Sequence, residues 1–142
     1  EFLAQGDTLK IDNSPFDLRT ATRIGDGLNN PNSQMKMVGG YDINYILGSS
    51  KDALKTAAHV TDPTSGRTLT VKTTQPCLQF YTGNNLDDTK ARDGSKLNRY
   101  AAFCLEAQDY PNGPNVNAFP TRPLARGETY AQRIDYIFGC AK

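Results

Sequence analysis

The stretch YAAFCLEAQDYPNG, residues 100–113, places one carboxylate, that of Glu106, at the end of an apolar run. Residues 100–105 are typical of a protein interior, where an unpaired charge is costly. Two explanations are open. In the structural one, Glu106 ends a strand and pairs with an arginine such as Arg99 or Arg122. In the functional one, Glu106 is a general base beside a bound ligand.

Strand geometry gives Glu106 a particular set of neighbours, because successive side chains of a strand point to opposite faces. Phe103 and Leu105 share one face of the expected strand. Ala102 and Cys104 share the other face with Glu106. We therefore expect small side chains next to this carboxylate and room there for a ligand.

Two further polar side chains have comparable settings. Asp42, in VGGYDINYIL, follows two glycines and a tyrosine. It either satisfies turn amides or receives sugar hydroxyls beside an aromatic face. Gln79, in TTQPCLQFYTGN, interrupts a strand suited to a core. It is either a satisfied core amide or a group that binds a hydroxyl, since an amide both donates and accepts.

The bulk properties exclude several classes of function. The chain has 142 residues and a formal net charge of +1, so it is one domain or part of a larger one. It has no basic block and no membrane-length apolar run, and we expect no nucleic-acid or membrane partner. The single histidine, His59, is expected at the surface and rules out a multi-histidine metal site within the chain.

The cysteines Cys77, Cys104 and Cys140 lack metal-site spacing. We expect three free, mostly buried thiols. Their odd number favours a reducing compartment, so the predicted location is cytoplasmic, with secretion as the alternative.

The elements that must position these residues are short strands. Period-two alternation predicts strands within 43–47, 54–62, 67–74, 77–81 and 130–138, separated by turns rich in Gly, Pro, Asn and Asp. Helix signals are poor. The spacing predicts an all-β, antiparallel sandwich or barrel. Two long aperiodic loops, 83–98 and 109–127, are expected to shape a binding site.

Five ordered blocks of the chain resemble one known family. They are SPFDLR, GGYDINYIL, VTDPTSGRTLTVKTTQPCLQFYTGN, AAFCLEAQDYPNGPN and FPTRPLARGETY. Together they resemble the C-terminal half of the aldose 1-epimerase (galactose mutarotase) family, over nearly the whole chain. The resemblance implies that residues 1–142 are the C-terminal part of a single antiparallel β-sandwich, the galactose mutarotase-like supersandwich.

The resemblance also implies an activity. Glu106 matches the family's general base, Asp42 the aspartate that holds sugar hydroxyls, and Gln79 a sugar-contacting glutamine. The implied enzyme is an aldose 1-epimerase, an isomerase that interconverts the α and β anomers of a monosaccharide such as galactose or glucose. It needs no metal or other cofactor. The alternative is a non-catalytic carbohydrate-binding protein on the same sandwich. An enzyme for a phosphorylated hexose ranks lower, because only Arg122 and Arg126 form a close basic pair.

The chain departs from the family pattern in informative places. Ile43 stands where many members have His, and Cys77 stands where Gly is usual. The family's acid histidine lies in the N-terminal half, and His59 does not match its position. The resemblance thus implies that this chain is incomplete alone and that its partners are the monosaccharide and the N-terminal half of the same protein. Uncovered strand edges predict that the isolated chain aggregates.

Overall fold

The structure is a computed structural model that describes residues 4, 6–48 and 53–141. Most elements within these residues are strands, and the expected all-β class is confirmed. In chain order they are α1 (Ile24–Leu28), α2 (Ser33–Val38), β1 (Asp42–Ile46), β2 (Lys55–Thr61), β3 (Arg67–Thr73), β4 (Cys77–Tyr81), β5 (Thr89–Lys90), β6 (Lys96–Leu97), β7 (Cys104–Gln108), the 3-10 helix η1 (Gly113–Asn115) and β8 (Ile134–Cys140). They form sheets of order β1-β4-β7, β2-β3-β8 and β5-β6.

The chain folds into two compact units. The first comprises Glu1–Gly6, Asn44–Gln79 and Leu105–Lys142, and the second comprises Asp7–Ile43 and Phe80–Cys104. The boundary between them runs through β1, β4 and β7, so each of these strands contributes residues to both units.

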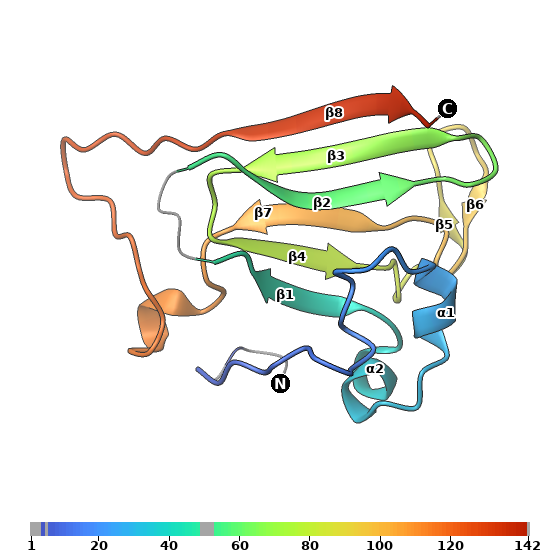
Figure 1. The fold of residues 1–142 in the computed structure, drawn as a ribbon, viewed down its shortest axis with the longest axis horizontal. Coiled ribbons are helices and arrows are strands. Elements are labelled where there is room, and N and C mark those ends of the chain that lie inside the picture. The colour runs from blue at the N-terminus through green and yellow to red at the C-terminus, as the bar shows by residue number, and fades with distance from the viewer. Residues whose placement is uncertain (1–3, 5, 49–52, 142) are drawn as a thin grey trace. The chain divides into compact units, whose positions relative to one another are not determined.

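The first unit contains the antiparallel sheet in which β3 lies between β2 and β8 (Figure 1). Strand β3 alternates as its sequence predicts. Val71 and Thr73 are fully buried on one side, whereas Lys72 between them is only half-buried. The turn from β2 to β3 is closed by Asp62, whose carboxylate accepts hydrogen bonds from the main-chain N–H groups of Thr64 and Ser65. This is the turn chemistry that the sequence DPTSG predicts.

Strand β8 is an edge of this sheet and carries exposed apolar side chains. It begins at Ile134, later than the expected strand over 130–138. Tyr136 is 52% exposed, Ile137 47% and Phe138 79%. Among the described residues, only β3 pairs with β8. Long apolar edges of this kind invite pairing with another strand.

The second unit has an aromatic core around Tyr41. Its ring lies 4.9 Å from that of Phe80 and meets the ring of Phe16 edge-on at 6.3 Å. The Tyr41 hydroxyl donates to the carbonyl oxygen of Pro15 at 3.0 Å, which satisfies its polar end inside the core. Met35 of α2 is also buried.

The two short helices of this unit were not expected from the sequence. Asn32 caps α2 by accepting from the N–H groups of Gln34 and Met35, and Gly39 ends it in the left-handed conformation. The residue types that make these caps also make turns, and helices of five and six residues are too short to show a clear 3.6-residue period.

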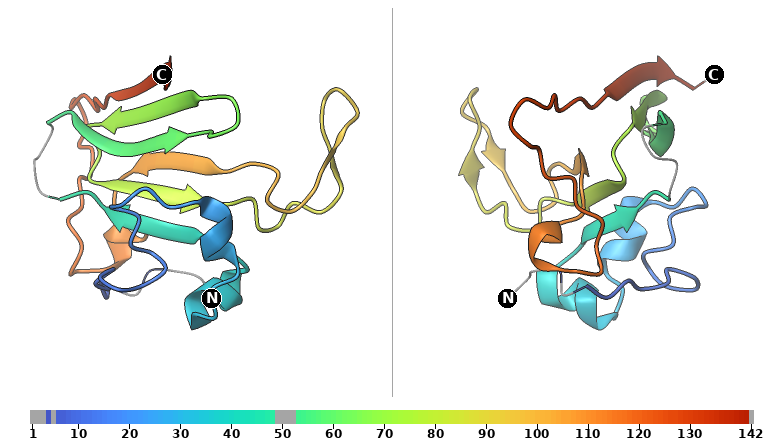
Figure 2. Two further views of the ribbon diagram at one scale, coloured as in Figure 1. Left: turned by 45° about the vertical axis from the view of Figure 1, so that its right-hand side comes forward. Right: turned by 90° about the vertical axis from the view of Figure 1, so that its left-hand side faces the viewer.

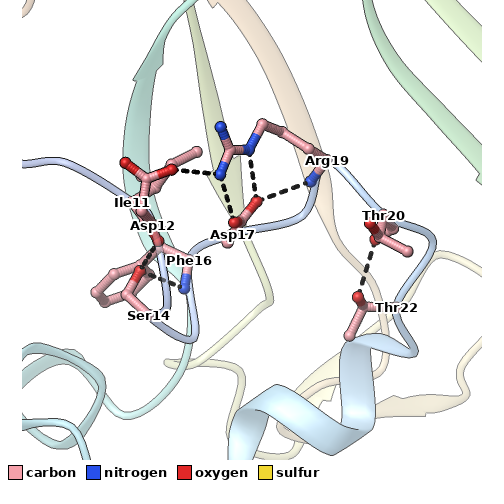
Figure 3. Close-up of polar contacts among 8 residues, drawn as sticks. All are labelled: Ile11, Asp12, Ser14, Phe16, Asp17, Arg19, Thr20 and Thr22. Carbon is pink, nitrogen blue, oxygen red and sulfur yellow. Dashed lines mark hydrogen bonds and ion pairs between the residues drawn. The ribbon is translucent and has the colours of Figure 1, made fainter.

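The block SPFDLR forms a tightly bonded loop in the second unit (Figure 3). The Ser14 hydroxyl donates to the carbonyl oxygen of Ile11 and accepts from the N–H of Phe16. Arg19 binds both carboxylate oxygens of Asp17, at 2.8 and 2.6 Å, and also Asp12 at 2.6 Å. This arrangement lowers the pKa of Asp17 below its usual value, chiefly through the side-chain hydrogen bond from Arg19.

Both long aperiodic loops contain a little regular structure. The loop over 83–98 carries the β5–β6 hairpin, which stands away from β4 in Figure 2. The loop over 109–127 carries η1. Tyr110 and Phe119 hold the second loop together, with ring centroids 5.3 Å apart.

Candidate active site

Glu106 lies in the middle of β7, where the sequence predicts a strand. Along β7, Cys104 and Glu106 are exposed and Leu105 is half-buried, so the predicted alternation is confirmed. The expectation that the preceding run is interior is wrong, because Tyr100 is 39% and Phe103 38% exposed. Glu106 is therefore an accessible carboxylate and not a buried charge.

The arginines offered as structural partners of Glu106 bond elsewhere. Arg99 donates to the carbonyl oxygen of Gly39 at 2.7 Å and lies over the ring of Tyr100. Arg122 pairs with Asp109 at 3.6 Å. In the part of the chain that the structure describes, Glu106 makes no ion pair, so the structural explanation finds no support.

Three side-chain amides form a row in the first unit, which we call the amide row: Asn44 on β1, Gln79 on β4 and Gln108 on β7. The Gln108 side-chain nitrogen donates to Asn44 Oδ1 at 3.0 Å and to Gln79 Oε1 at 3.3 Å. Since β4 lies between β1 and β7, the Gln108 side chain reaches over the middle strand. The three amides therefore share one face of the sheet.

Glu106 and Gln79 are brought together on this face. Residues two apart on a strand share a face and are separated by roughly 7 Å, so Glu106 is on the same side of β7 as Gln108. Gln79 is half-buried on β4, the neighbouring strand, whereas Leu78 and Phe80 on either side of it are buried. A carboxylate and an amide on adjacent strands suit the binding of a polyhydroxylated molecule.

Cys77 lies buried behind the amide row. Its thiol accepts a hydrogen bond from the Asn44 side chain. Burial raises the pKa of this thiol, an effect that the Asn44 hydrogen bond partly opposes. Cys77 is thus neutral near pH 7 and acts as part of the framework.

Asp42 is the first residue of β1 and belongs to the second unit. Its carboxylate is exposed, but Tyr41 before it is fully buried, so the expected aromatic face beside Asp42 is not available for stacking. Gly40, with φ at 150°, lies against the Asn84 and Thr82 side chains, and a Cβ there would overlap both. The two glycines therefore let the chain turn closely past these side chains into β1.

The remaining candidates have structural settings. His59 is exposed on β2, and its Nδ1 lies 2.8 Å from the hydroxyl of its cross-strand neighbour Thr70. The three cysteines are free as expected, but only Cys77 is buried. Among the described residues, no cluster of three or more His, Cys, Asp or Glu side chains could hold a metal ion. No described helix is long and apolar enough to cross a membrane.

Comparison with known proteins gives this geometry its context. The sequence matches the family described as aldose 1-epimerase over residues 1–136. This chain belongs to the aldose 1-epimerase family. A galactose mutarotase from Sus scrofa is 38% identical over 137 residues, which is 96% of this chain and 38% of the relative. An aldose 1-epimerase from Escherichia coli is 35% identical over 125 residues, 87% of this chain and 36% of that protein.

Solved structures of aldose epimerase homologues share the fold. The aldose epimerase homologue from C. elegans aligns with a TM-score of 0.84 at 22% identity, covering 99% of this chain and 41% of that one. The galactose 1-epimerase from Lactobacillus acidophilus aligns with a TM-score of 0.64 at 27% identity, covering 94% and 37%. The fold is the all-β sandwich of the galactose epimerases. The chain spans about two fifths of the length of the relatives it matches.

Sequence reasoning missed Asn44 and Gln108 as parts of the site. A signal for both was present, because each lies two residues after a chosen residue, Asp42 or Glu106, in the same strand. The period of two that placed Glu106 on an accessible face places Gln108 there as well. What the sequence did not give is the reach of Gln108 across β4.

Proposed function

We propose that this chain supplies the base and part of the sugar-binding surface of an aldose 1-epimerase acting on a monosaccharide such as galactose or glucose. The observation that carries the proposal is the exposed carboxylate of Glu106 on the same sheet face as the amide row, in a chain of this family. The accessible carboxylate suits a proton acceptor, and the amides suit hydroxyl recognition.

The reaction begins with a proton transfer. Glu106 removes the proton from the C1 hydroxyl of the cyclic sugar while an acid protonates the ring oxygen. The C1–O5 bond breaks and gives the open-chain aldehyde, rotation about C1–C2 turns the carbonyl over, and reclosure yields the other anomer. Each positioned proton transfer contributes on the order of 10²–10⁴-fold.

Asp42 and Gln79 hold sugar hydroxyls in this proposal. A carboxylate accepts hydrogen bonds from two hydroxyls, and an amide both donates and accepts, so together they favour particular hydroxyl orientations. The histidine that acts as acid lies outside this chain, since His59 is committed to the β2–β3 surface.

The part of the family fold that the chain does not span is its proposed partner. The curated relatives are far longer than this chain, which covers 38% of the pig enzyme. Strand β8 offers an exposed apolar edge for it, with Tyr136, Ile137 and Phe138 available to cover. A strand added to β8 would satisfy the backbone groups of that edge and bury these side chains.

We place the protein in the cytoplasm. Cys104 and Cys140 are exposed, free thiols, which suit a reducing compartment.

The test follows anomer interconversion directly. Freshly dissolved α-D-galactose and α-D-glucose are followed by polarimetry with the complete gene product. Catalysis well above the spontaneous rate is expected. Sugar binding, measured by calorimetry, with only the spontaneous rate of interconversion would establish the alternative, a non-catalytic carbohydrate-binding protein.

A further inference from the structure

We propose that Gln108 is a positioning residue that fixes which end of the Gln79 amide faces a bound sugar. This inference rests on the proposed function and adds a residue to it. Its basis is the set of hydrogen bonds within the amide row, all of which lie in the first unit.

The first step concerns the two ends of the Gln79 side chain. An amide has an oxygen that only accepts and a nitrogen that only donates, and a half-turn of the side chain exchanges them. Gln79 Oε1 accepts from Gln108 at 3.3 Å. The nitrogen of Gln79 therefore points to the other side, and Gln79 meets a ligand as a donor.

The second step asks what keeps Gln108 in its own orientation. Its nitrogen carries two hydrogens, and both are directed at oxygens, one on Gln79 and one on Asn44. If Gln108 were turned over, its oxygen would face the oxygens of both neighbours. The bond to Asn44 therefore selects the orientation that also serves Gln79.

The third step extends the chain to the buried side of the sheet. Asn44 accepts from Gln108 through its oxygen, so its nitrogen is the end that donates to the Cys77 sulfur. Cys77 is fully buried. The donor direction is therefore set from the interior outward, through Asn44 and Gln108 to Gln79.

The consequence is a preference in how hydroxyls are bound. A sugar hydroxyl beside Gln79 receives a hydrogen bond on its oxygen and keeps its own proton for another acceptor. An amide free to turn would bind either end of the hydroxyl and discriminate less between epimers. Gln108 thus contributes to affinity and orientation without touching the sugar.

The experiment is a double-mutant cycle on the complete gene product. Gln79→Met, Gln108→Met and the double variant are compared, because methionine keeps the length of glutamine and removes its polar end. We expect each single variant to raise KM for galactose by about 3- to 10-fold, the loss of one neutral hydrogen bond, with kcat changed far less. The double variant should bind no more weakly than Gln79→Met alone. Gln132→Met, at an exposed glutamine outside the strands, is the matched control and should match wild type.

A merely structural role for Gln108 gives a different result. The effects of Gln79→Met and Gln108→Met would then multiply, or Gln108→Met would lower kcat and the melting temperature with no change in KM, and either outcome overturns the inference. If Gln108→Met does not fold, Gln108→Glu replaces it, because a carboxylate accepts only and must turn Gln79 over. An unchanged dissociation constant for galactose in that variant would refute the role.

Failure of the proposed function is distinguishable from failure of the inference. A wild-type protein that binds galactose without turnover removes the epimerase proposal, and the cycle is then read from dissociation constants. A wild-type protein with neither turnover nor sugar binding removes both.

Discussion

The side chain of Asn84 donates a 2.9 Å hydrogen bond to the main-chain carbonyl oxygen of Tyr41, the residue directly before Asp42. The N–H of Tyr41 donates to the Thr82 hydroxyl at 3.0 Å. Both polar groups of the Tyr41 backbone are thus held by the segment YTGN. Two blocks that lie far apart in the sequence are joined here, and the bonds fix the backbone from which Asp42 projects.

Replacing Asn84 by alanine should destabilise the protein by about 1–3 kcal/mol, because it leaves a buried carbonyl oxygen with one fewer donor and opens a gap. Asn84 is 5% exposed, whereas Asn85 beside it is exposed. Asn85→Ala is therefore the control and should change stability by less than about 0.5 kcal/mol. Urea unfolding of both variants measures the difference. Equal midpoints would mean that the Tyr41 anchor contributes little.

Two glycines of α1 should respond in opposite ways to alanine. A Cβ at Gly27 would overlap the Tyr41 hydroxyl and ring, whereas a Cβ at Gly25 meets nothing within 4 Å. Gly27→Ala should cost about 1–3 kcal/mol through overpacking of the aromatic core. Gly25→Ala should be neutral or stabilise by up to about 1 kcal/mol through helix propensity. Thermal melts of the two variants under one set of conditions decide this.

Replacing Glu106 by glutamine should reduce catalysed anomer interconversion by at least about 10²-fold, because glutamine cannot accept the C1 proton. Sugar binding should persist, since the size and shape of the side chain are kept. Glu128→Gln makes the same change at an exposed turn glutamate and should retain full turnover. Polarimetry gives the rates and calorimetry the affinities. Undiminished turnover in the Glu106 variant would remove this residue from the mechanism.

The Asp17–Arg19 pair should make a small, pH-dependent contribution to stability. The hydrogen bond from Arg19 lowers the pKa of Asp17 in the folded state, so the unfolded state binds the proton more tightly. The contribution is therefore present above the unfolded pKa of an aspartate and is lost as the pH falls through the lower, folded value. Arg19→Met should raise the pKa of Asp17 toward its usual value.

Carboxyl ¹³C NMR titration of Asp17 checks this shift, with Arg23→Met as the control at an arginine that caps α1 without a side-chain bond. The stability difference between wild type and Arg19→Met should be visible at pH 7 and should shrink in acid. A difference that grows as the pH falls would contradict the sign.

Phe138 on β8 should have opposite effects in the isolated chain and in the complete gene product. Phe138→Lys places a charge on the exposed apolar edge, so the 142-residue chain alone should associate less, as seen by light scattering. In the complete product the same change should lower the melting temperature, because a docked strand would bury Phe138. Leu9→Lys, at an exposed leucine outside the strands, should do neither. An unaffected complete product would mean that β8 stays uncovered.

Local pattern predicted the strands well where both the alternation and the turn residues were clear. The run CLQFY was expected as a strand and is β4, and β3 matches its expected range to within a residue. The same reasoning extended β8 back to Tyr130, but the chain before Ile134 is irregular. Instead, Tyr130 accepts a hydrogen bond from the buried Gln75 side chain, a tertiary contact that no local pattern encodes.

The candidate site was predictable in its residues and less so in its environment. Alternation placed Glu106 on an open face, and the family resemblance supplied Asp42 and Gln79. The burial of the segment before Glu106 was misjudged, because apolar composition indicates a preference for the interior without saying whether this chain alone provides the cover. The amide row required the order of β1, β4 and β7, which depends on long-range pairing.

The buried thiol behind the amide row also provides a clock. A disulfide reagent attacks only an accessible thiolate, so Cys104 and Cys140 should react at once and Cys77 only when the sheet around it opens. The slow phase of that reaction then reports the opening frequency of the sheet under native conditions, with no label introduced. A sugar that braces this face would slow the phase, so the same unmodified protein would report occupancy of its own site.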